Sequence, residues 1–448
     1  MALLFIFVFI ALILYLLAPA EYSYSYCLLL HNLYIIYVVY LHKLDCGKEI
    51  IGYNTIFAVS FYFTNFVYPV FIYPVFPDFS LFSFGFNYNV ITKSTALALL
   101  AYSCFGFGYN KIKNNATRNY KLIDNYQLFP IKILNRWRWI VILSFVLFYL
   151  MGGYEMFEHT YQVAVARGNL LPRLMNVLIV PINVLATTFI LREISNKRIN
   201  IWNLIFCVVC ISLMLTGTRT FPLMLLTILF YIYCNFKQLS KISVYLFMLG
   251  GVIIMSLVGE MRGEGINLAN LGNYNLKDDF SIGYWNMMSD LIINNRNLYV
   301  LYDYVQDVDV TYGLTMLSNI LSPIPFLQSL FVNLTGIPDY ILGSATFSTY
   351  LTLGPNPSLG LGTNLLGDVY LSFGLFGVII LFYFLGYFIN YLRQKTFKGF
   401  YFQTIVYFAM IGDCVYFCRS SYLGNLRTII WAIVLGYLVV RIYKIHVK

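Results

Sequence analysis

The sequence is poor in charge. Asp, Glu, Lys and Arg make up only 11% of its 448 residues, whereas a soluble globular domain has about 25%. Hydrophobic residues make up 60% of the chain, and the mean hydropathy is +0.73. Because so few side chains are charged, they cannot cover a water-facing surface, and most of the chain must contact lipid. The composition therefore excludes an ordinary soluble protein and predicts an all-α polytopic integral membrane protein.

The sequence also lacks the patterns of metal, redox and nucleotide chemistry. Its eight cysteines form no paired framework, since Cys207 and Cys210 have no second pair, and its four histidines are dispersed. No P-loop, HExxH, GxSxG or GxGxxG motif is present. Asp307-Val308-Asp309 matches the DxD of some metal-dependent glycosyltransferases, but no α/β alternation surrounds it, so we interpret it as a coincidence. We expect no metal and no cofactor.

Twelve apolar runs are long enough to cross a bilayer, which takes roughly 17–25 residues. They lie near residues 2–19, 23–41, 50–72, 94–110, 137–153, 174–191, 200–216, 221–236, 242–258, 365–391, 400–418 and 427–443. We therefore predict three parts: a bundle of nine spans over 1–258, a large loop over 259–364, and three C-terminal spans over 365–448.

The distribution of charge predicts the direction of these spans. With the N-terminus in the cytoplasm, the cytoplasmic segments and span edges contain 20 of the 29 lysines and arginines but only four of the 19 acids. This is the positive-inside bias, and it places both termini in the cytoplasm and 259–364 outside. The net charge is +10, but the basic residues are scattered between spans, which argues against nucleic acid as a partner.

The external segment has two regions of different character. Trp285, Met288, Ile292, Tyr299 and Tyr302 recur at helical spacing, which predicts a helix over 280–305 on the membrane face or on the bundle. Residues 336–364 are rich in Gly, Pro, Ser and Thr, which predicts a loop. We therefore expect short helices within a long external loop.

Several arginines are not explained by topology. Nine basic residues lie outside the cytoplasmic set and seven of them are arginine, the side chain that binds phosphate through a planar fork. Arg219 lies in a tight turn between Gly217 and Pro222, where the backbone is restricted. The alternative for such arginines is a span-end side chain that reaches lipid headgroups. For Arg219 we favour a binding role.

Carboxylates lie close to the same side of the chain. Glu260, Arg262 and Glu264 fall within one short segment containing Gly263 and Gly265, which could bind a diphosphate and position a general base. The alternative is a solvated turn. Further acids on this side are Asp290, Asp368 at the start of the tenth span, and Asp413, which could pair with Arg419.

Three features together resemble the O-antigen polymerase family, the Wzy-type oligosaccharide repeat-unit polymerases. They are Gly217-Thr218-Arg219 at an external turn, a large external loop with Arg262 and Arg296, and GTNLLGDVYLSFGLFGVII at 362–380. The resemblance implies a GT-C-like enzyme of the bacterial inner membrane with a periplasmic active site. Its donor and acceptor are undecaprenyl-diphosphate-linked oligosaccharides in contact with membrane lipids, and a chain-length regulator is a further candidate partner.

The resemblance also implies roles for the residues above. Arginines would neutralise the leaving diphosphate, and a carboxylate would deprotonate the acceptor hydroxyl. The diphosphate-binding candidates are Arg219, Arg262 and Arg296; the catalytic candidates are Glu260, Glu264 and Asp368; the supporting candidates are Arg419, Asp413 and Asp290.

Two other functions fit the same architecture. An O-antigen ligase generally has a histidine in the large loop, and residues 259–364 contain none. A lipid-linked oligosaccharide flippase or transporter should carry its charges inside a central cavity rather than across one external loop. The sequence therefore favours a polymerase and leaves open its sugars, its linkage and which carboxylate is the base.

Overall fold

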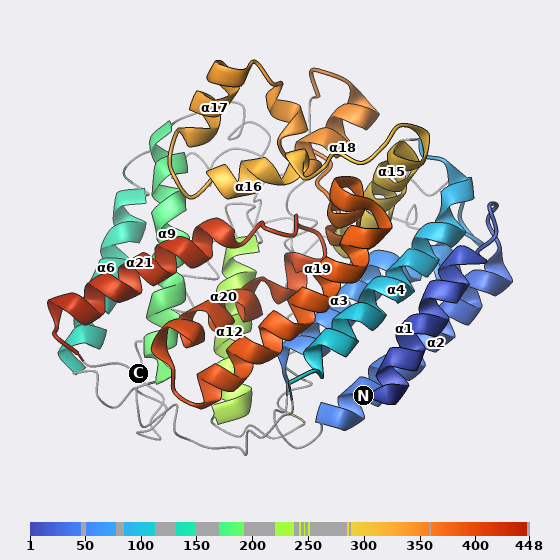
Figure 1. The fold of residues 1–448 in the computed structure, drawn as a ribbon. Helices are drawn as coiled ribbons and strands as arrows, with labels where there is room; N and C mark the ends of the chain where they lie inside the picture. The colour runs from blue at the N-terminus through green and yellow to red at the C-terminus, as the bar shows by residue number, and fades with distance from the viewer. Residues whose placement is uncertain are drawn as a thin grey trace, which may run out of the picture. The chain divides into compact units, whose positions relative to one another are not determined.

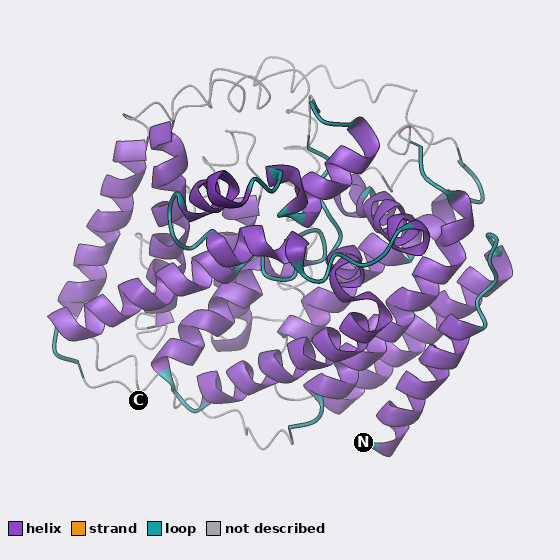
Figure 2. Cartoon of the chain, turned by 45° about the horizontal axis from the view of Figure 1, so that its top comes forward, coloured by secondary structure: helices purple, strands orange, loops and turns teal. Residues whose placement is uncertain are grey.

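The structure is a computed structural model that describes residues 1–45, 51–77, 85–112, 131–148, 150, 170–191, 220–236, 242, 246, 250, 285, 288–357 and 360–445. Within these ranges every regular element is a helix and no strand is present (Figure 2). The predicted all-α class is thereby confirmed for the described part of the chain.

Long helices alternate with groups of short ones (Figure 1). The long helices are α1 (Ala2–Leu16), α2 (Tyr24–Asp45), α3 (Tyr53–Asn65), α4 (Ile91–Tyr109), α6 (Ile131–Phe148), α9 (Leu170–Phe189), α12 (Thr220–Phe236), α15 (Asn294–Asp307), α19 (Leu365–Phe397), α20 (Tyr401–Phe417) and α21 (Leu426–Ile442). The short helices are η1 (Tyr68–Ile72), η3 (Tyr88–Val90), α14 (Ser289–Ile292), η7 (Leu314–Met316), α16 (Leu317–Leu321), α17 (Leu327–Thr335), η8 (Asp339–Ile341) and α18 (Ser344–Leu353).

Helices occur where the apolar runs predict them. Apart from 200–216 and 242–258, which lie mostly or wholly outside the described residues, each predicted run contains a described helix. Among the residues that the structure describes, three helical segments are long and apolar enough to cross a membrane: Tyr24–Leu44, Tyr88–Tyr109 and Leu365–Phe397. α1 is a shorter apolar helix. The full set of twelve spans stays a prediction.

The chain forms two compact units. The first contains Met1–Thr117, Ser289–Gln394 and Cys414–Arg427, and the second contains Arg118–Met288, Lys395–Asp413 and Thr428–Lys448. The described candidate residues lie mainly in the first unit. The predicted boundaries at 258 and 364 divide the chain by membrane topology, whereas these units are defined by contacts. The predicted boundaries therefore stay a prediction.

Aromatic side chains and close backbone contacts hold the first unit together. The Phe7 and Tyr37 rings stack with centroids 4.2 Å apart, which joins α1 to α2. The Tyr37 hydroxyl donates to the Ser103 carbonyl on α4 at 3.1 Å. A Cβ atom at Gly108 would collide with the Tyr383 carbonyl oxygen, so α4 and α19 are in backbone contact there. Such contacts are typical of packed membrane helices.

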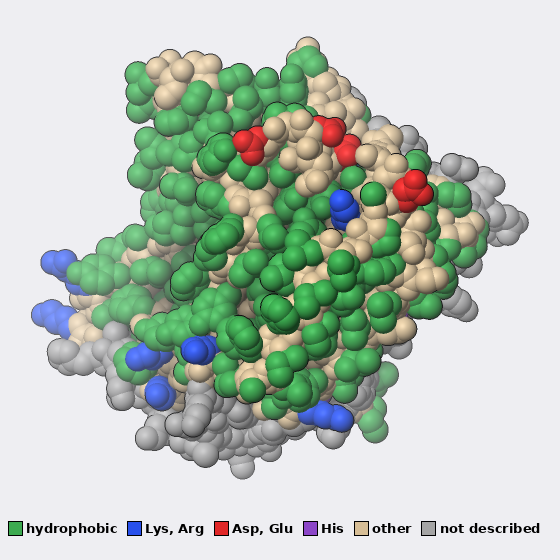
Figure 3. Space-filling model, turned by 45° about the vertical axis from the view of Figure 1, so that its right-hand side comes forward, with side chains coloured by type: hydrophobic (Ala, Val, Ile, Leu, Met, Phe, Trp, Pro, Cys, Tyr) green, Lys and Arg blue, Asp and Glu red, His purple; other side chains and the backbone are tan. Residues whose placement is uncertain are grey.

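The two ends of the first unit differ in their balance of charge. α2 and α4 run in the same direction, because Ser23 N donates to Thr92 Oγ1 near their starts and a Cβ at Gly106 would meet Leu41 near their ends. At the starting end lie the acids Glu21 and Asp303 beside Lys93, and at the other end lie Lys43, Lys111 and Arg393 beside Asp45, the last residue of α2. In Figure 3 the acidic side chains gather at one edge of a mainly hydrophobic face. We call these the acidic end and the basic end.

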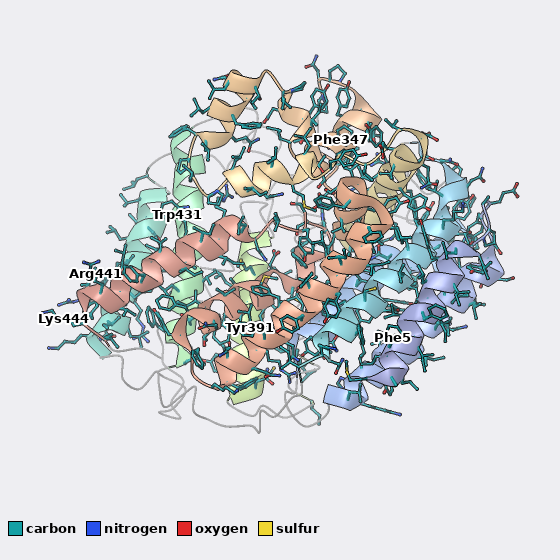
Figure 4. The ribbon with its side chains drawn as sticks, in the orientation of Figure 1. Phe5, Phe347, Tyr391, Trp431, Arg441 and Lys444 are labelled. Carbon is teal, nitrogen blue, oxygen red and sulfur yellow. The ribbon has the colours of Figure 1, made fainter. Side chains whose placement is uncertain are left out.

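The second unit is a group of packed apolar helices. Trp137 Nε1 on α6 donates to the Ile182 carbonyl on α9 at 3.1 Å. The Tyr231 ring on α12 meets the Tyr407 ring on α20 edge-on, with centroids 5.8 Å apart. Arg441 lies in the last turn of α21 and Lys444 just after it, whereas Trp431 lies nearer the start of the helix (Figure 4). The unit therefore has basic side chains where α21 ends.

The external segment differs in part from its predicted structure. The spacing of aromatic residues predicts a helix, and α14 and α15 are present there with Ile292, Tyr299 and Tyr302 buried. The prediction of a loop over 336–364 is wrong, because η8 and α18 lie within it. Phe347 on α18 packs into a buried cluster with Leu301 and Leu371 (Figure 4). This packing stabilises a helix that the local composition does not predict.

Candidate functional site

Asn364 organises the start of α19. Its Oδ1 accepts hydrogen bonds from the backbone N–H groups of Leu366 at 2.9 Å and Gly367 at 3.3 Å, the capping role that asparagine favours. Its Nδ2 donates to Asn65 Oδ1 on α3 and to the Asn294 carbonyl on α15, both at 3.3 Å. One buried side chain therefore caps α19 and fixes it to two other helices.

Buried asparagines hold α15 in place. Asn294, Asn295 and Asn297 are all at most 1% exposed. Asn295 Nδ2 donates to the Phe63 carbonyl at 3.2 Å, and Asn297 Nδ2 donates to the Leu361 carbonyl at 2.8 Å. An amide offers both donors and an acceptor, so it can connect several backbones at once. Sequence reasoning missed this role, although the run Asn-Asn-Arg-Asn at 294–297 in a buried helix was a usable signal.

Arg296 is a buried cation at the acidic end. Its side chain is 1% exposed, and Nη2 donates to Thr352 Oγ1 on α18 at 2.7 Å. Burial lowers the pKa of this guanidinium to about 10, because desolvation disfavours its charged form. The side chain still carries its charge at neutral pH. The structure thus places one predicted diphosphate-binding residue in the protein interior.

Asp368 connects the first turn of α19 to the loop that follows α20. The carboxylate is fully buried, and Oδ2 accepts a hydrogen bond from Tyr422 N at 2.8 Å. The same loop accepts through the Cys418 carbonyl, which lies 3.0 Å from Leu365 N. A carboxylate in a first helical turn also interacts favourably with the helix dipole. Asp368 therefore helps to hold the loop after α20 against the start of α19.

α15 brings Arg296 close to the helix turn that carries Asp368. A Cβ at Gly367 would lie 3.0 Å from Leu301 Cδ1 and 3.4 Å from Leu298 Cα. Together with the bond from Asn364 to Asn294, this packs α15 directly on the first turn of α19. The fold thus brings two predicted site residues, far apart in sequence, to the same end of the first unit.

α19 is broken at Gly374. This residue has φ 62° and ψ −154°, a conformation outside the helical region that favours glycine. The Leu371 carbonyl accepts instead from Thr311 N at 2.8 Å, and the Ser372 carbonyl from Gly313 N at 3.2 Å. The sequence predicts a span over 365–391, and the structure adds a break at Gly374 that the apolar pattern does not indicate.

Buried tyrosines lie beside the first part of α19, residues 365–373, which precedes the break. The Tyr302 and Tyr370 rings stack with centroids 4.8 Å apart, and the Tyr15 and Tyr302 hydroxyls lie 3.1 Å from each other. Gln306 Nε2 donates to the Tyr370 hydroxyl at 2.8 Å. Burial raises the pKa of Tyr302, so its hydroxyl stays protonated and serves as a hydrogen-bond partner.

The other predicted site residues are less fully placed. Arg219, Glu260, Arg262 and Glu264 lie outside the described residues. Asp290 belongs to α14, but its side chain is outside the description. The Arg419 guanidinium lies over the Tyr416 ring, 5.8 Å from its centroid, in the first unit, whereas Asp413 is buried in the second. Their pairing stays a prediction.

The DxD acids take part in a turn. Asp309 Oδ1 accepts from Val310 N at 2.7 Å, and Oδ2 accepts from the Tyr312 hydroxyl at 3.0 Å. In the described ranges no group of three or more His, Cys, Asp or Glu side chains could hold a metal ion. The carboxylate of Asp309 thus has a local structural role.

Several described helices are apolar and long enough to span a membrane. The protein is therefore a multi-pass membrane protein. A family model, O-antigen polysaccharide polymerase Wzy, matches residues 1–448, and the chain belongs to this family. This confirms the resemblance noted in the sequence. No curated protein and no solved structure matches the chain.

Proposed function

We propose that this protein polymerises undecaprenyl-diphosphate-linked oligosaccharide repeat units at the periplasmic face of the bacterial inner membrane. The observation that carries the proposal is the family match over the whole chain. The same match favours a polymerase over the ligase and the flippase that the sequence leaves open. The activity is a glycosyl transfer between two lipid-linked oligosaccharides.

The charge of the first unit supports the side on which this chemistry takes place. Lysines and arginines of a membrane protein concentrate on the cytoplasmic side. The basic end, with Lys43 and Lys111, therefore faces the cytoplasm, and the acidic end faces the periplasm. Arg296 and Asp368 both lie at the acidic end. The candidate site and the external loop then share the periplasmic side.

The reaction needs two kinds of side chain. The bond between the donor's anomeric carbon and its diphosphate oxygen breaks, and a bond forms from that carbon to a hydroxyl oxygen of the acceptor repeat unit. The hydroxyl proton passes to a carboxylate, and the electron pair leaves with undecaprenyl diphosphate. Arg219, Arg262 and Arg296 would stabilise the negative charge that develops on the leaving group.

Three carboxylates are candidates for the general base: Glu260, Glu264 and Asp368. Asp368 is 0% exposed and one of its oxygens already accepts from Tyr422 N. A base must reach the hydroxyl whose proton it removes. This favours Glu260 or Glu264 as the base, with Asp368 as a residue that positions the loop 418–425.

Deletion of the gene tests the proposed function. The readout is the glycan ladder on a gel from whole-cell extracts, with and without the wild-type gene supplied in trans. Loss of a polymerase leaves a single repeat unit on each lipid. Loss of a ligase leaves none, and loss of a flippase also blocks surface display. A deletion strain with a normal ladder would contradict the proposal.

Substitutions at Asp368 separate its two roles. Asp368→Asn keeps an acceptor oxygen for Tyr422 N but cannot take up a proton, whereas Asp368→Ala loses both functions. We expect the Asn variant to keep most of the ladder and the Ala variant to lose it. Asp309→Asn, on an exposed turn, is the matched control. Equal loss in both Asp368 variants would instead identify this residue as the base.

A further inference from the structure

Three buried polar atoms lie on segments that meet near Arg296 at the acidic end. They are Asn297 Oδ1 on α15, Ser348 Oγ on α18 and Thr363 Oγ1 just before α19. Their side chains are 1%, 0% and 2% exposed, respectively. None of the three atoms has a hydrogen-bond partner within the described ranges. We call these three residues the amide–hydroxyl cluster.

The segments that carry the cluster are directly connected. Asn297 Nδ2 donates to the Leu361 carbonyl at 2.8 Å, and Leu361 N donates to Thr349 Oγ1 on α18 at 3.0 Å. A Cβ at Gly362 would lie 3.8 Å from Asn297 Nδ2. Thr363 follows directly along the chain, and Ser348 precedes Thr349. The cluster therefore belongs to one junction of α15, α18 and residues 360–363.

Arg296 extends the same junction. It precedes Asn297 on α15 and donates to Thr352 Oγ1, and Thr352 in turn donates to the Ser348 carbonyl at 3.0 Å. The cation that we propose for diphosphate binding and the cluster are therefore parts of one polar region. A ligand that contacts the cluster would therefore also lie close to Arg296.

We propose that the amide–hydroxyl cluster is a carbohydrate subsite, which binds hydroxyl groups of a sugar ring of the lipid-linked oligosaccharide. The inference rests on the proposed function and adds where in this chain the sugar is recognised. Buried polar atoms in proteins nearly always have a partner. Three such atoms at one junction are the signature of a place where a polar ligand completes the hydrogen bonding.

The chemistry of the three atoms selects the ligand. Asn297 Oδ1 can only accept a hydrogen bond, whereas the Ser348 and Thr363 hydroxyls can donate and accept. A phosphate oxygen at neutral pH offers acceptors, so it could not satisfy Asn297. A metal ion would find only neutral oxygens here. A sugar ring carries several hydroxyl groups, each of which both donates and accepts, so it offers a partner of the right type to each of the three atoms.

α18 covers the cluster and determines access to it. Gly354 follows α18 with φ +79°, and Gly362 precedes Thr363 with φ +78°. Phe347 of α18 packs against Leu301, which lies on α15 one turn after Asn297. A sugar reaches the cluster when α18 and residues 360–363 separate. The two glycines are the positions where the backbone can change direction at the smallest steric cost.

The test uses Ser348→Ala and Thr363→Val, each of which removes one hydroxyl with little change of shape. The probe is the oligosaccharide released by mild acid from the lipid that accumulates in the gene-deletion strain. We expect each variant, purified in detergent, to bind this probe about five- to tenfold more weakly than the wild type. The melting temperature should stay equal or rise, because each change removes a buried hydroxyl without a partner.

Ser103→Ala and Thr95→Val are the matched controls. Both residues are fully buried in α4, and both hydroxyls donate to carbonyls of their own helix. The controls should bind the probe as the wild type does. Unchanged binding in Ser348→Ala and Thr363→Val, or weaker binding only together with a lower melting temperature, would overturn the inference.

A failure of the proposed function can be distinguished from a failure of the carbohydrate subsite. If the wild-type gene restores no ladder to the deletion strain, polymerisation itself is contradicted. If the ladder is restored but the wild-type protein does not bind the released oligosaccharide, only the carbohydrate subsite is contradicted. A restored ladder with weaker binding in both cluster variants supports the two together.

Discussion

Arg296 combines a permanent charge with almost complete burial. Its pKa is lowered to about 10 by desolvation, yet it keeps its proton at neutral pH. A lysine begins from a lower pKa, about 10.4, so the same desolvation would bring its pKa closer to neutrality. Arginine is therefore the side chain that can hold a charge at this position over the whole physiological range.

This difference gives a pH-dependent prediction. In Arg296→Lys we expect polymerisation, relative to the wild type, to be highest at pH 6 and to fall as the pH rises, because desolvation lowers the pKa of the lysine. The charged form, present below the lysine's pKa, is the form that attracts the diphosphate. The measurement is the initial rate with purified enzyme and lipid-linked repeat units from pH 6 to 9. Arg441→Lys, at an exposed position, should give a flat ratio.

If the rate of Arg296→Lys equals the wild-type rate at every pH, the charge at position 296 is not used. A uniformly low ratio without pH dependence would show instead that the planar fork, and not the charge, is essential.

Arg219 is predicted from sequence to bind the diphosphate. Loss of one preorganised donor to a developing charge costs about 3 kcal/mol, a rate decrease of roughly a hundredfold. We expect Arg219→Ala to reduce the glycan ladder strongly and Arg219→Lys to reduce it less, since lysine keeps the charge but not the fork. Ladders are compared at matched amounts of membrane protein, with Arg441→Ala as control. A full-length ladder from Arg219→Ala would make this arginine a headgroup anchor and move the diphosphate role to Arg262.

Among the helices, α19 depends most on a single glycine. Gly374 has φ 62°, and a Cβ there would meet Val310 Cγ1 at 3.3 Å. We expect Gly374→Ala to destabilise the protein by about 1–3 kcal/mol, because it strains the backbone where Thr311 and Gly313 complete the hydrogen bonding of α19. The measurement is the melting temperature in detergent. Gly85→Ala, with nothing within 4 Å of its Cβ and no positive φ, is the control.

If Gly374→Ala melts at the wild-type temperature, residues 365–397 form a continuous helix in solution and the break is not a feature of the native state.

α15 and α18 show what helix patterns can and cannot predict. α15 is predictable because Ile292, Tyr299 and Tyr302 lie at helical spacing and their burial follows from that spacing. α18 is not, because its Ser- and Thr-rich sequence has low intrinsic helix propensity. Its helix forms where Phe347 reaches Leu301 and Leu371. That contact joins segments distant in sequence, which no local pattern contains.

For the whole chain, the orientation in the membrane is the central prediction. We expect reporter fusions at Asn125 and Lys395 to read cytoplasmic, and fusions at Asn275 and Tyr340 to read periplasmic. The reasons are the basic residues of the cytoplasmic segments and the separation of acidic and basic ends in the first unit. Paired reporters, one active on each side, give the measurement. A cytoplasmic signal at Asn275 would invert the orientation and remove the candidate site from the periplasm.

The candidate site was predictable only as far as charge is visible in a sequence. Arg296 and Asp368 stand out because they are charged residues in apolar or aromatic surroundings, and the structure brings their helices together. Asn364 does not stand out, since an uncharged amide is common on any surface, and the run of asparagines that includes Asn297 is a signal only in a helix already expected to be buried. Their roles depend on which backbones meet them, and this is decided by tertiary packing.

The break in α19 also matters for the thickness of the bilayer. α19 has 33 residues, and at 1.5 Å per residue an unbroken helix of that length would reach about 50 Å. The hydrocarbon core is only about 30 Å thick. Residues 375–397 alone reach about 34 Å, which matches the core with a slight tilt. The preceding half-helix, with Asp368, then needs no place in the hydrocarbon, and the bilayer needs no local thickening around it.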